Sequence, residues 1–370
     1  MKIKTKTKKI LILCFICLIC LLNLFILSGC KNDGQIQIAM IMTEKSRLND
    51  GNFNQSAYEG IERYAKNKDI NYKAYPPDSK SDEDYLKAME KAQKDGAEII
   101  ITPGFNFGTA VFTAQDLYPD IHFIFIDGIP NNGKDGGDYE EKIAPNTYSV
   151  MFAEDQAGFL AGYAIVKDGF RKLGFLGGYA FPAVVKYGYG FVQGAEYAAK
   201  EMGLAKGEVT IKYDYAGNFD PTPENQAKAS SWYNNGVEVI FACGGAMGNS
   251  VISAAESMPG KWVIGVDTDQ SGDSETVITS AMKMMANAVN LAIESHYGGN
   301  FPGGQSLYLG ADVDGVGMEI DNARFRTFTK AEYEKIYGML SKNENNLTSS
   351  IINDLSLKPA DLPCEYVVLE

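Results

Sequence analysis

The chain has 370 residues, of which 45% are hydrophobic, and its formal net charge is −13. This length suits one large domain or two medium ones. The excess of acidic side chains disfavours nucleic acid and anionic membrane surfaces as partners, because like charges repel.

The first 30 residues are typical of an export signal and are not expected to belong to the fold. MKIKTKTKK precedes an apolar run from Ile10 to Leu27, and LSGC then ends at Cys30. A basic start, an apolar stretch and small residues before a cleavage point are the parts of a signal peptide. LSGC resembles a bacterial lipobox, so we expect lipidation at Cys30 and a tether over 31–35. The alternative is an uncleaved anchor helix.

Short apolar runs alternate with helix-like segments along the rest of the chain. In the first half, strands are predicted at 36–42, 71–77, 98–104 and 122–128, and helices at 56–66, 81–96 and 108–118. In the second half, helices are predicted at 152–166, 184–203, 225–236 and 248–258, and strands at 172–178, 208–217, 238–245 and 261–267. Strands alternating with helices predict parallel sheets covered by helices on both faces.

The restart of this pattern after residue 150 predicts two α/β lobes, each a doubly wound parallel sheet. We expect an N-terminal lobe over 36–148 that is completed by about 276–310, and a C-terminal lobe over 149–275 that is completed by about 311–345. Three crossings between the lobes are expected, near 146–150, 269–278 and 309–316. Residues 346–370 form a tail whose structure the sequence does not predict.

Polar, glycine-rich and aromatic residues follow the predicted strands directly. The stretch LNDGNFNQSAYEG, residues 48–60, places Phe53 and two amides beside a turn that Asn49, Asp50 and Gly51 would already explain. Similar loops follow other strands, as in TPGFNFG, YAGNFD, CGGAMG and VDTDQ. In open α/β sheets, ligands bind beyond the carboxyl ends of the strands. These loops are therefore candidates for a ligand site between the lobes.

Histidine and cysteine are too scarce to support catalysis or metal binding by these residues. His122 and His296 are the only two histidines, and each is expected to be structural. Apart from the signal segment, the cysteines are Cys243 and Cys364, whose spacing fits no zinc pattern. A single disulfide between them remains open. No cofactor and no metal are expected.

Several motifs together resemble the basic membrane protein family of lipoproteins, the PnrA-like substrate-binding proteins of ABC transporters for purine nucleosides. The motifs are NDGNFNQSAYEG, PDIHFIFID, FLAGYAI, GYGFVQGAE, GNFDP, IGVDTDQ and TSAMK, and the resemblance covers about residues 36–320. It implies a type I periplasmic-binding fold, no catalysis, and a monomer that closes its lobes around the ligand and serves ABC permease subunits. It also implies a lipid anchor on the extracytoplasmic face of the cell membrane. In the tail, KPADLPCEYVVLE departs from the helix and short strand expected to end the family.

The resemblance also implies the residues of the ligand site: Asp50, Phe53, Asn54, Asp127, Phe219, Gly245, Asp267 and Lys283. An ionised carboxylate only accepts hydrogen bonds and therefore selects the N–H groups of a purine edge, which Asp50, Asn54 and Asp127 would read. Asp267 would accept hydrogen bonds from the sugar hydroxyls, and Lys283 would donate to them. The two phenylalanines could hold the flat base between their faces. Without a side chain at Gly245, a backbone N–H could approach the ligand closely.

Three other functions compete with nucleoside uptake. The first is an enzyme: DTD at 267–269 resembles the metal motif of glycosyltransferases, and DVDG at 312–315 lacks the rest of a calcium loop. A nucleoside hydrolase would need aspartates clustered around a metal, whereas here they are spread over the sequence with no histidine beside them. A binding protein for a sugar or vitamin would use the same residue types. A sensor lipoprotein would use the same closed lobes and hand the signal to a membrane receptor.

Overall fold

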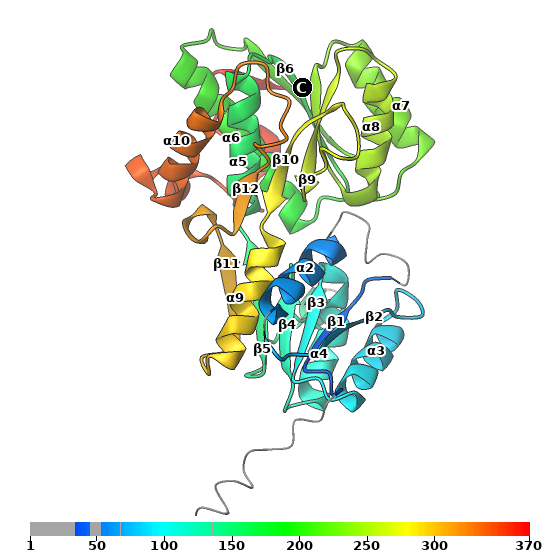
Figure 1. The fold of residues 1–370 in the computed structure, drawn as a ribbon. Coiled ribbons are helices and arrows are strands. Elements are labelled where there is room, and N and C mark those ends of the chain that lie inside the picture. Colours follow the sequence, from blue (N-terminus) through cyan, green and yellow to red (C-terminus); the bar gives the residue numbers. More distant parts are fainter. Residues whose placement is uncertain (1–33, 45–52, 67, 135) are drawn as a thin grey trace, which may run out of the picture.

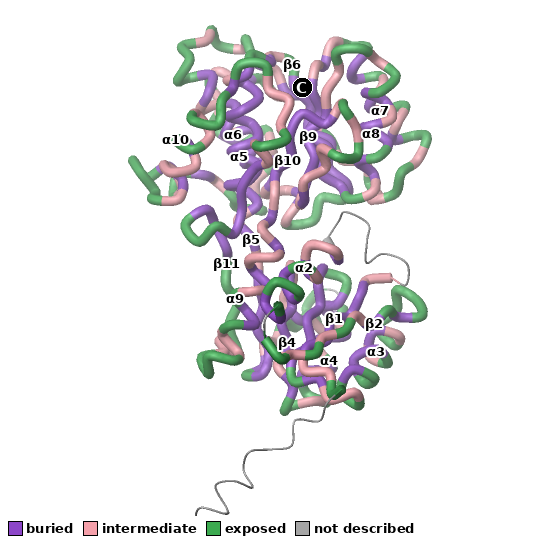
Figure 2. The backbone as a smooth tube through the Cα atoms, in the orientation of Figure 1, coloured by how far each residue is buried: buried purple, intermediate pink, exposed green. Residues whose placement is uncertain are grey.

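The computed structural model describes residues 34–44, 53–66, 68–134 and 136–370, and these residues form two lobes (Figure 1). Each lobe is a mainly parallel sheet with helices on both faces, as the alternation of strands and helices predicts. The strands form the buried centre of each lobe, and exposed residues gather on the surrounding helices and loops (Figure 2).

The first lobe is built on a parallel sheet with the strand order β11-β5-β4-β3-β1-β2. Its strands are β1 (Ile38–Ile41), β2 (Tyr72–Tyr75), β3 (Ile99–Pro103), β4 (His122–Ile126), β5 (Thr147–Phe152) and β11 (Gln305–Leu309). Every residue of β1 and β3 is buried. This burial explains their uninterrupted apolar sequences, because a central strand of a doubly covered sheet has no face exposed to water.

The second lobe has the strand order β12-β10-β9-β8-β6-β7-β13, in which β12 runs antiparallel to β10 and the other pairs are parallel. Its strands are β6 (Lys172–Gly177), β7 (Val209–Tyr215), β8 (Val239–Cys243), β9 (Trp262–Asp267), β10 (Val277–Lys283), β12 (Val316–Met318) and β13 (Val367–Leu369). The carboxyl ends of the parallel strands in both sheets face the space between the lobes (Figure 1).

Helices cover both faces of each sheet. In the first lobe these are α2 (Phe53–Ala65) and α9 (Met285–Tyr297) on one face, and α3 (Asp82–Lys94) and α4 (Gly108–Leu117) on the other. In the second lobe they are α5 (Glu154–Lys167), α6 (Pro182–Met202), α10 (Lys330–Ser341) and α11 (Leu347–Ser350) on one face, and α7 (Pro223–Asn234) and α8 (Gly248–Glu256) on the other. Short 3-10 turns include η1 (Phe105–Phe107), η2 (Gly136–Asp138), η3 (Gly245–Met247), η4 (Ala311–Val313), η5 (Glu344–Asn346) and η6 (Pro359–Asp361).

The chain crosses between the lobes at Ala153, at Met284 and over 310–315. The first two crossings lie later than the expected windows of 146–150 and 269–278. The reason is that β5 extends to Phe152, and that β10 pairs with β9 and so belongs to the second lobe, not to the first as expected for 276–310. The crossing segments are joined by backbone hydrogen bonds from Ala153 to Leu309 (3.1 Å) and from Met284 to Gly315 (2.9 Å).

Helices α5 and α6 pack against each other at very short range. Glycines line their contact, and a Cβ added at Gly162 would lie 2.0 Å from the carbonyl oxygen of Phe191. A Cβ at Gly190 would lie 1.9 Å from the carbonyl oxygen of Asp155. Because no side chain fits there, the two helices fix each other's position, and with it the residues at the start of α5 and along α6.

The C-terminal tail completes the second sheet. Val367 pairs with Val209 as β13 adds to the edge of β7 in parallel. The side chain of Glu196 on α6 accepts hydrogen bonds from the backbone N–H groups of Glu365, Tyr366 and Val367, at 2.8–3.2 Å. The expectation that KPADLPCEYVVLE replaces the final strand is therefore wrong. Val367–Leu369 pair with the edge of β7, and the half-buried carboxylate of Glu196 accepts hydrogen bonds from the backbone at the start of this strand.

The scarce histidines and cysteines have structural positions. His122 and His296 contact each other through their Nδ1 atoms at 2.7 Å, and this contact attaches α9 to β4. Burial lowers the pKa of both imidazoles, which suits a pair in which one ring donates and the other accepts. Cys243 is buried in β8 and Cys364 lies in the tail, and both are free thiols.

Candidate functional site

Lys283, the last residue of β10, lies among three carboxylates where the two lobes meet. Its Nζ atom is 2.7 Å from Asp127 Oδ1, 3.3 Å from Glu154 Oε1 and 3.6 Å from Asp267 Oδ1. Asp127 follows β4 of the first lobe, whereas Asp267 ends β9 of the second. The lysine therefore joins carboxylates from both lobes, and we call these four residues the Lys283 cluster.

The two aspartates of the cluster are its accessible members. The side chains of Lys283 and Glu154 are 2% and 1% exposed, while those of Asp127 and Asp267 are 13% and 32% exposed. Both aspartates have left-handed backbone angles, with φ of 69° and 66°. Aspartate tolerates this conformation better than most residues. The matching geometry turns both carboxylates to the same place at the ends of two strands.

Burial and pairing act against each other on the ionisation of the cluster. Burial lowers the pKa of Lys283, but the carboxylates around it outweigh burial and raise that pKa well above its usual value. Burial raises the pKa of Asp267, and the lysine opposes this effect. Burial also raises the pKa of Glu154 to about 7, again against the attraction of Lys283. The cluster thus holds a fixed positive charge and one carboxyl that titrates near neutrality.

Two residues of α6 complete the cluster. The hydroxyl of Tyr187 donates to Asp267 Oδ1 at 3.1 Å, and Lys186 Nζ lies 3.9 Å from Glu154 Oε2. Sequence reasoning missed these residues and Glu154. The only signal was a pair of acids opening an otherwise apolar helix, which is ordinarily explained by the positive end of the helix dipole.

Aromatic rings from both lobes meet beside the same strand ends. Phe105 in η1 of the first lobe contacts two rings of the second lobe, Phe181 at 5.5 Å and Phe219 at 6.4 Å between centroids. Tyr179 lies 5.3 Å from Phe219 at nearly right angles. The ring facing Phe219 across the lobes is therefore Phe105. The side chain of Phe53, the expected partner, lies outside the described residues.

Glycines make room for this aromatic group. A Cβ at Gly178 would lie 2.3 Å from the ring of Phe219, so the ring occupies the place of a side chain. The predicted Gly245 starts η3 with φ of 53°, and a Cβ there would meet open space. The left-handed backbone of Gly245 favours glycine, and no neighbouring atom would block a ligand that approaches its backbone.

The remaining predicted site residues lie elsewhere or are not described. Asn54 is buried, and its amide donates to Thr43 Oγ1 at 2.8 Å and accepts from the Thr43 N–H at 3.4 Å, which attaches α2 to the end of β1. Asp50 and Cys30 lie outside the described residues. The structure therefore brings together Asp127, Asp267 and Lys283, while Phe219 follows β7 and Gly245 follows β8 in the second sheet.

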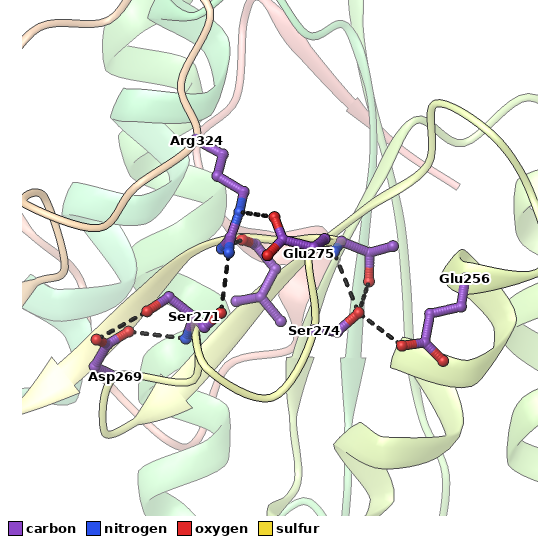
Figure 3. A network of polar contacts seen from close by, with 8 residues as sticks. Glu256, Asp269, Ser271, Ser274, Glu275 and Arg324 are labelled. Atoms are coloured by element: carbon purple, nitrogen blue, oxygen red, sulfur yellow. Dashed lines mark hydrogen bonds and ion pairs between the residues drawn. The ribbon is translucent and has the colours of Figure 1, made fainter.

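The second aspartate of DTD belongs to the loop between β9 and β10. Asp269 accepts from the backbone N–H and hydroxyl of Ser271, at 2.8 and 2.9 Å. Figure 3 shows this loop held by Arg324, which donates to Glu275 Oε2 at 3.1 Å and to the Ser271 carbonyl at 3.2 Å. Asp267 and Asp269 thus serve different networks. Across the described residues, no group of three or more His, Cys, Asp or Glu side chains is arranged to hold a metal ion.

Two further features concern surfaces away from the cluster. A hollow of about 460 Å³ lies within the second lobe, lined by residues of α5, α6 and the tail, including Phe159, Tyr197 and Cys364. It is open and does not reach the strand ends, so we do not assign the ligand to it. In the part of the chain that the structure describes, no helix combines the length and apolar character needed to cross a membrane.

Comparison with known proteins identifies the family of the chain. The family described as "ABC transporter substrate-binding protein PnrA-like" matches residues 37–356. The ABC transporter nucleoside-binding protein BmpA of Lactococcus lactis is 27% identical, over 80% of this chain and 88% of its own. Basic membrane protein B of Borreliella burgdorferi is 30% identical, over 88% of this chain and 92% of its own.

The fold is also similar to that of solved structures. A solute-binding protein of an ABC transporter system from Aeropyrum pernix superposes with a TM-score of 0.60 at 22% identity, covering 84% of this chain and 86% of its own. The predicted two-lobed type I periplasmic-binding fold is therefore confirmed.

Proposed function

The chain belongs to the PnrA-like family of ABC transporter substrate-binding proteins, and on this premise we propose that it binds a purine nucleoside between its lobes. The ligand would be delivered to the permease subunits of an ABC transporter. The name of the nucleoside-binding relative supports the ligand class.

The Lys283 cluster is the observation that carries this proposal. Asp127 and Asp267 come from opposite lobes, each partly accessible, and share one ammonium. Carboxylates accept hydrogen bonds only, so they favour a neutral ligand that offers hydroxyl or N–H donors. A phosphorylated ligand would face the carboxylates of Asp127 and Asp267 and would be repelled. A nucleoside fits these conditions better than a nucleotide does.

The aromatic rings at the strand ends support a purine base as part of the ligand. A purine offers a flat, polarisable ring that packs favourably against aromatic faces. Phe219 and Phe105 lie on opposite lobes with ring centroids 6.4 Å apart, so a base would insert where the two rings now meet. In this arrangement Asp127 reads the base edge together with Asp50, Asp267 and Lys283 contact the ribose, and the backbone at Gly245 approaches the sugar. Asn54 would act by fixing the start of α2.

The same proposal covers location and assembly. Lipidation at Cys30 would anchor a monomer at the extracytoplasmic face of the cell membrane. The described chain begins at the amino end of β1, opposite the carboxyl ends of the strands. A tether leaving from there keeps the ligand site away from the anchor.

Ligand identification tests the proposal. We expect the full chain, purified in detergent without added ligand and then denatured, to release a purine nucleoside that mass spectrometry identifies. In titration calorimetry, inosine and guanosine should bind at least a hundredfold more tightly than ribose. Recovery of a free sugar or vitamin, or equal affinity for ribose and inosine, would contradict the proposal and favour the alternative binding proteins.

A further inference from the structure

Glu154 is a buried carboxylate without a hydrogen-bond donor of its own. It is the first residue of α5, directly after the first crossing, and it is fully buried. Neither of its side-chain oxygens accepts a hydrogen bond among the described residues. Its balancing charges are Lys283 at 3.3 Å and Lys186 at 3.9 Å. Such a group is costly to bury, so a role for it is expected.

Glu154 and the aspartates lie around the same ammonium but differ in access to solvent. Asp127 and Asp267 are partly exposed, whereas the side chain of Glu154 is 1% exposed. A ligand between the lobes can therefore reach the two aspartates and not the glutamate. A ligand would compete with Lys283 for aspartate oxygens, whereas the buried Glu154 would keep its contact with the lysine.

We propose that Glu154 is a positioning residue for Lys283, whose ionised form draws the ammonium inward and leaves the oxygens of Asp127 and Asp267 free to accept hydrogen bonds from the ligand. This inference rests on the proposed function, since it concerns the same site. It adds a residue that never touches the ligand yet sets its affinity.

The proposal makes binding dependent on pH. The charged or titratable groups that face Glu154 are Lys283 on β10, Lys186 and Tyr187 on α6, Asp127 after β4 and Cys243 on β8. Asp267 on β9 is linked to it through their shared partner Lys283. The charge of Asp127 raises the pKa of Glu154, which lies at about 7. Ligand donors on Asp127 would offset that charge and lower the pKa. Binding thus releases a proton near neutral pH, and affinity increases as pH rises from 6 to 8.

Titration calorimetry of the full chain in detergent tests the inference. Inosine would be titrated at pH 6, 7 and 8, in two buffers that differ in ionisation enthalpy. We expect the affinity of the unmodified chain to rise about fivefold over this range, with a fraction of a proton released at pH 7. Glu154→Gln, which keeps the shape and removes the charge, should bind more weakly at pH 8, without pH dependence or proton release.

The neighbouring acid provides the control. Asp155 is also buried at the start of α5, but its carboxylate accepts from Asn353 at 3.2 Å. Asp155→Asn should keep the pH dependence of the unmodified chain. Circular dichroism would verify that both variants fold, and Glu154→Asp should restore part of the proton release if the glutamine variant is unstable.

Each outcome bears on a different claim. Inosine binding with an affinity that is constant from pH 6 to 8, or that keeps its pH dependence in Glu154→Gln, would overturn the role of Glu154 and leave the proposed function standing. No inosine binding at any pH would overturn the proposed function and this inference with it.

Discussion

Lys283 illustrates how a single residue couples stability to binding. Its ammonium is buried, and three carboxylates from α5, β9 and the end of β4 surround it. A buried charge is tolerated only when it is paired, and removal of one partner leaves the others uncompensated. Because the lysine is the centre of the cluster, its loss exposes the carboxylates to mutual repulsion.

Lys283→Met should therefore destabilise the protein by about 3–5 kcal/mol at pH 8. Without the ammonium, the folded state binds more protons than the unfolded state, so stability falls as pH rises. The loss should be smaller at pH 5, where carboxyls with raised pKa values are protonated. Urea denaturation at both pH values measures it.

A surface lysine serves as the control for this substitution. Lys73 lies on β2 and pairs with Asp95 at 3.0 Å, but its side chain is 45% exposed. Lys73→Met should cost less than about 1 kcal/mol at either pH, because water already screens the pair. Equal losses for the two variants would show that the Lys283 cluster has no special role in stability.

The contribution of base stacking to inosine affinity can be tested at Phe219. Stacking on an aromatic side chain is worth about 1–3 kcal/mol per base. Phe219→Ala should therefore weaken inosine binding by about tenfold to a hundredfold. Phe301, which stacks on His122 at 3.9 Å at the amino end of β4, is the control, and Phe301→Ala should leave inosine affinity unchanged. A change of less than twofold for Phe219→Ala in calorimetry would place this ring in the core.

At the scale of elements, the contact of α5 with α6 determines where the site residues stand. Glu154 opens α5, and Lys186 and Tyr187 lie on α6. The helices approach closely because glycines face carbonyl oxygens across the contact. A shift of either helix would move the residues around Lys283.

Gly162→Ala should destabilise the protein by about 3 kcal/mol, because its Cβ would overlap the carbonyl of Phe191. Gly338 in α10 is the matched control, since a Cβ there would meet no atom within 4 Å. Gly338→Ala should stabilise the protein by about 0.5–1 kcal/mol through reduced chain entropy in the unfolded state. The midpoints of urea denaturation measure both changes. The midpoint should fall for Gly162→Ala and rise for Gly338→Ala, and a shift in the same direction for both would contradict this explanation.

The C-terminal strand depends on one carboxylate. Glu196→Ala should cost about 2–3 kcal/mol, because backbone N–H groups of the tail lose a charged acceptor. Hydrogen exchange at Val367–Leu369 should become faster. Glu365→Ala removes only an exposed pair with Lys206 and should change neither quantity measurably. Unchanged exchange in Glu196→Ala would show that β13 is held by its pairing with β7 alone.

At the scale of the whole molecule, two lobes are joined by short crossing segments that hydrogen-bond to one another. Such segments can absorb a change in backbone angles while each lobe stays rigid. Phe105 and Phe219 already contact across the lobes, and so do Lys283 and Asp127. A ligand that bridges these groups would favour the closed arrangement.

We therefore expect inosine to make the molecule more compact. Small-angle X-ray scattering should show a smaller radius of gyration at saturating inosine than without ligand. Ribose-5-phosphate, which the carboxylates should repel, is the control and should leave the curve unchanged. Identical curves with and without inosine, under conditions where calorimetry shows binding, would contradict lobe closure.

The sequence by itself determined the two α/β lobes and the strand ends that carry polar residues. These features follow from local periodicity, because a buried strand is continuously apolar and its loop follows directly. It also identified Asp127, Asp267 and Lys283, through motifs that resemble a known family. Their roles toward a ligand are still proposals.

Only the tertiary structure decided which of these residues meet and what completes them. Lys283 and Asp127 are 156 residues apart in sequence, and the position of β10 in the second sheet brings them together. In the sequence, Glu154 has the pattern of an ordinary helix start, and only the structure shows that it is buried against Lys283. The tail forms a strand because the edge of β7 is free to pair with it and Glu196 accepts hydrogen bonds from its backbone. Pairing of buried charges and strand edges depends on contacts between distant segments, and local sequence patterns do not encode those contacts.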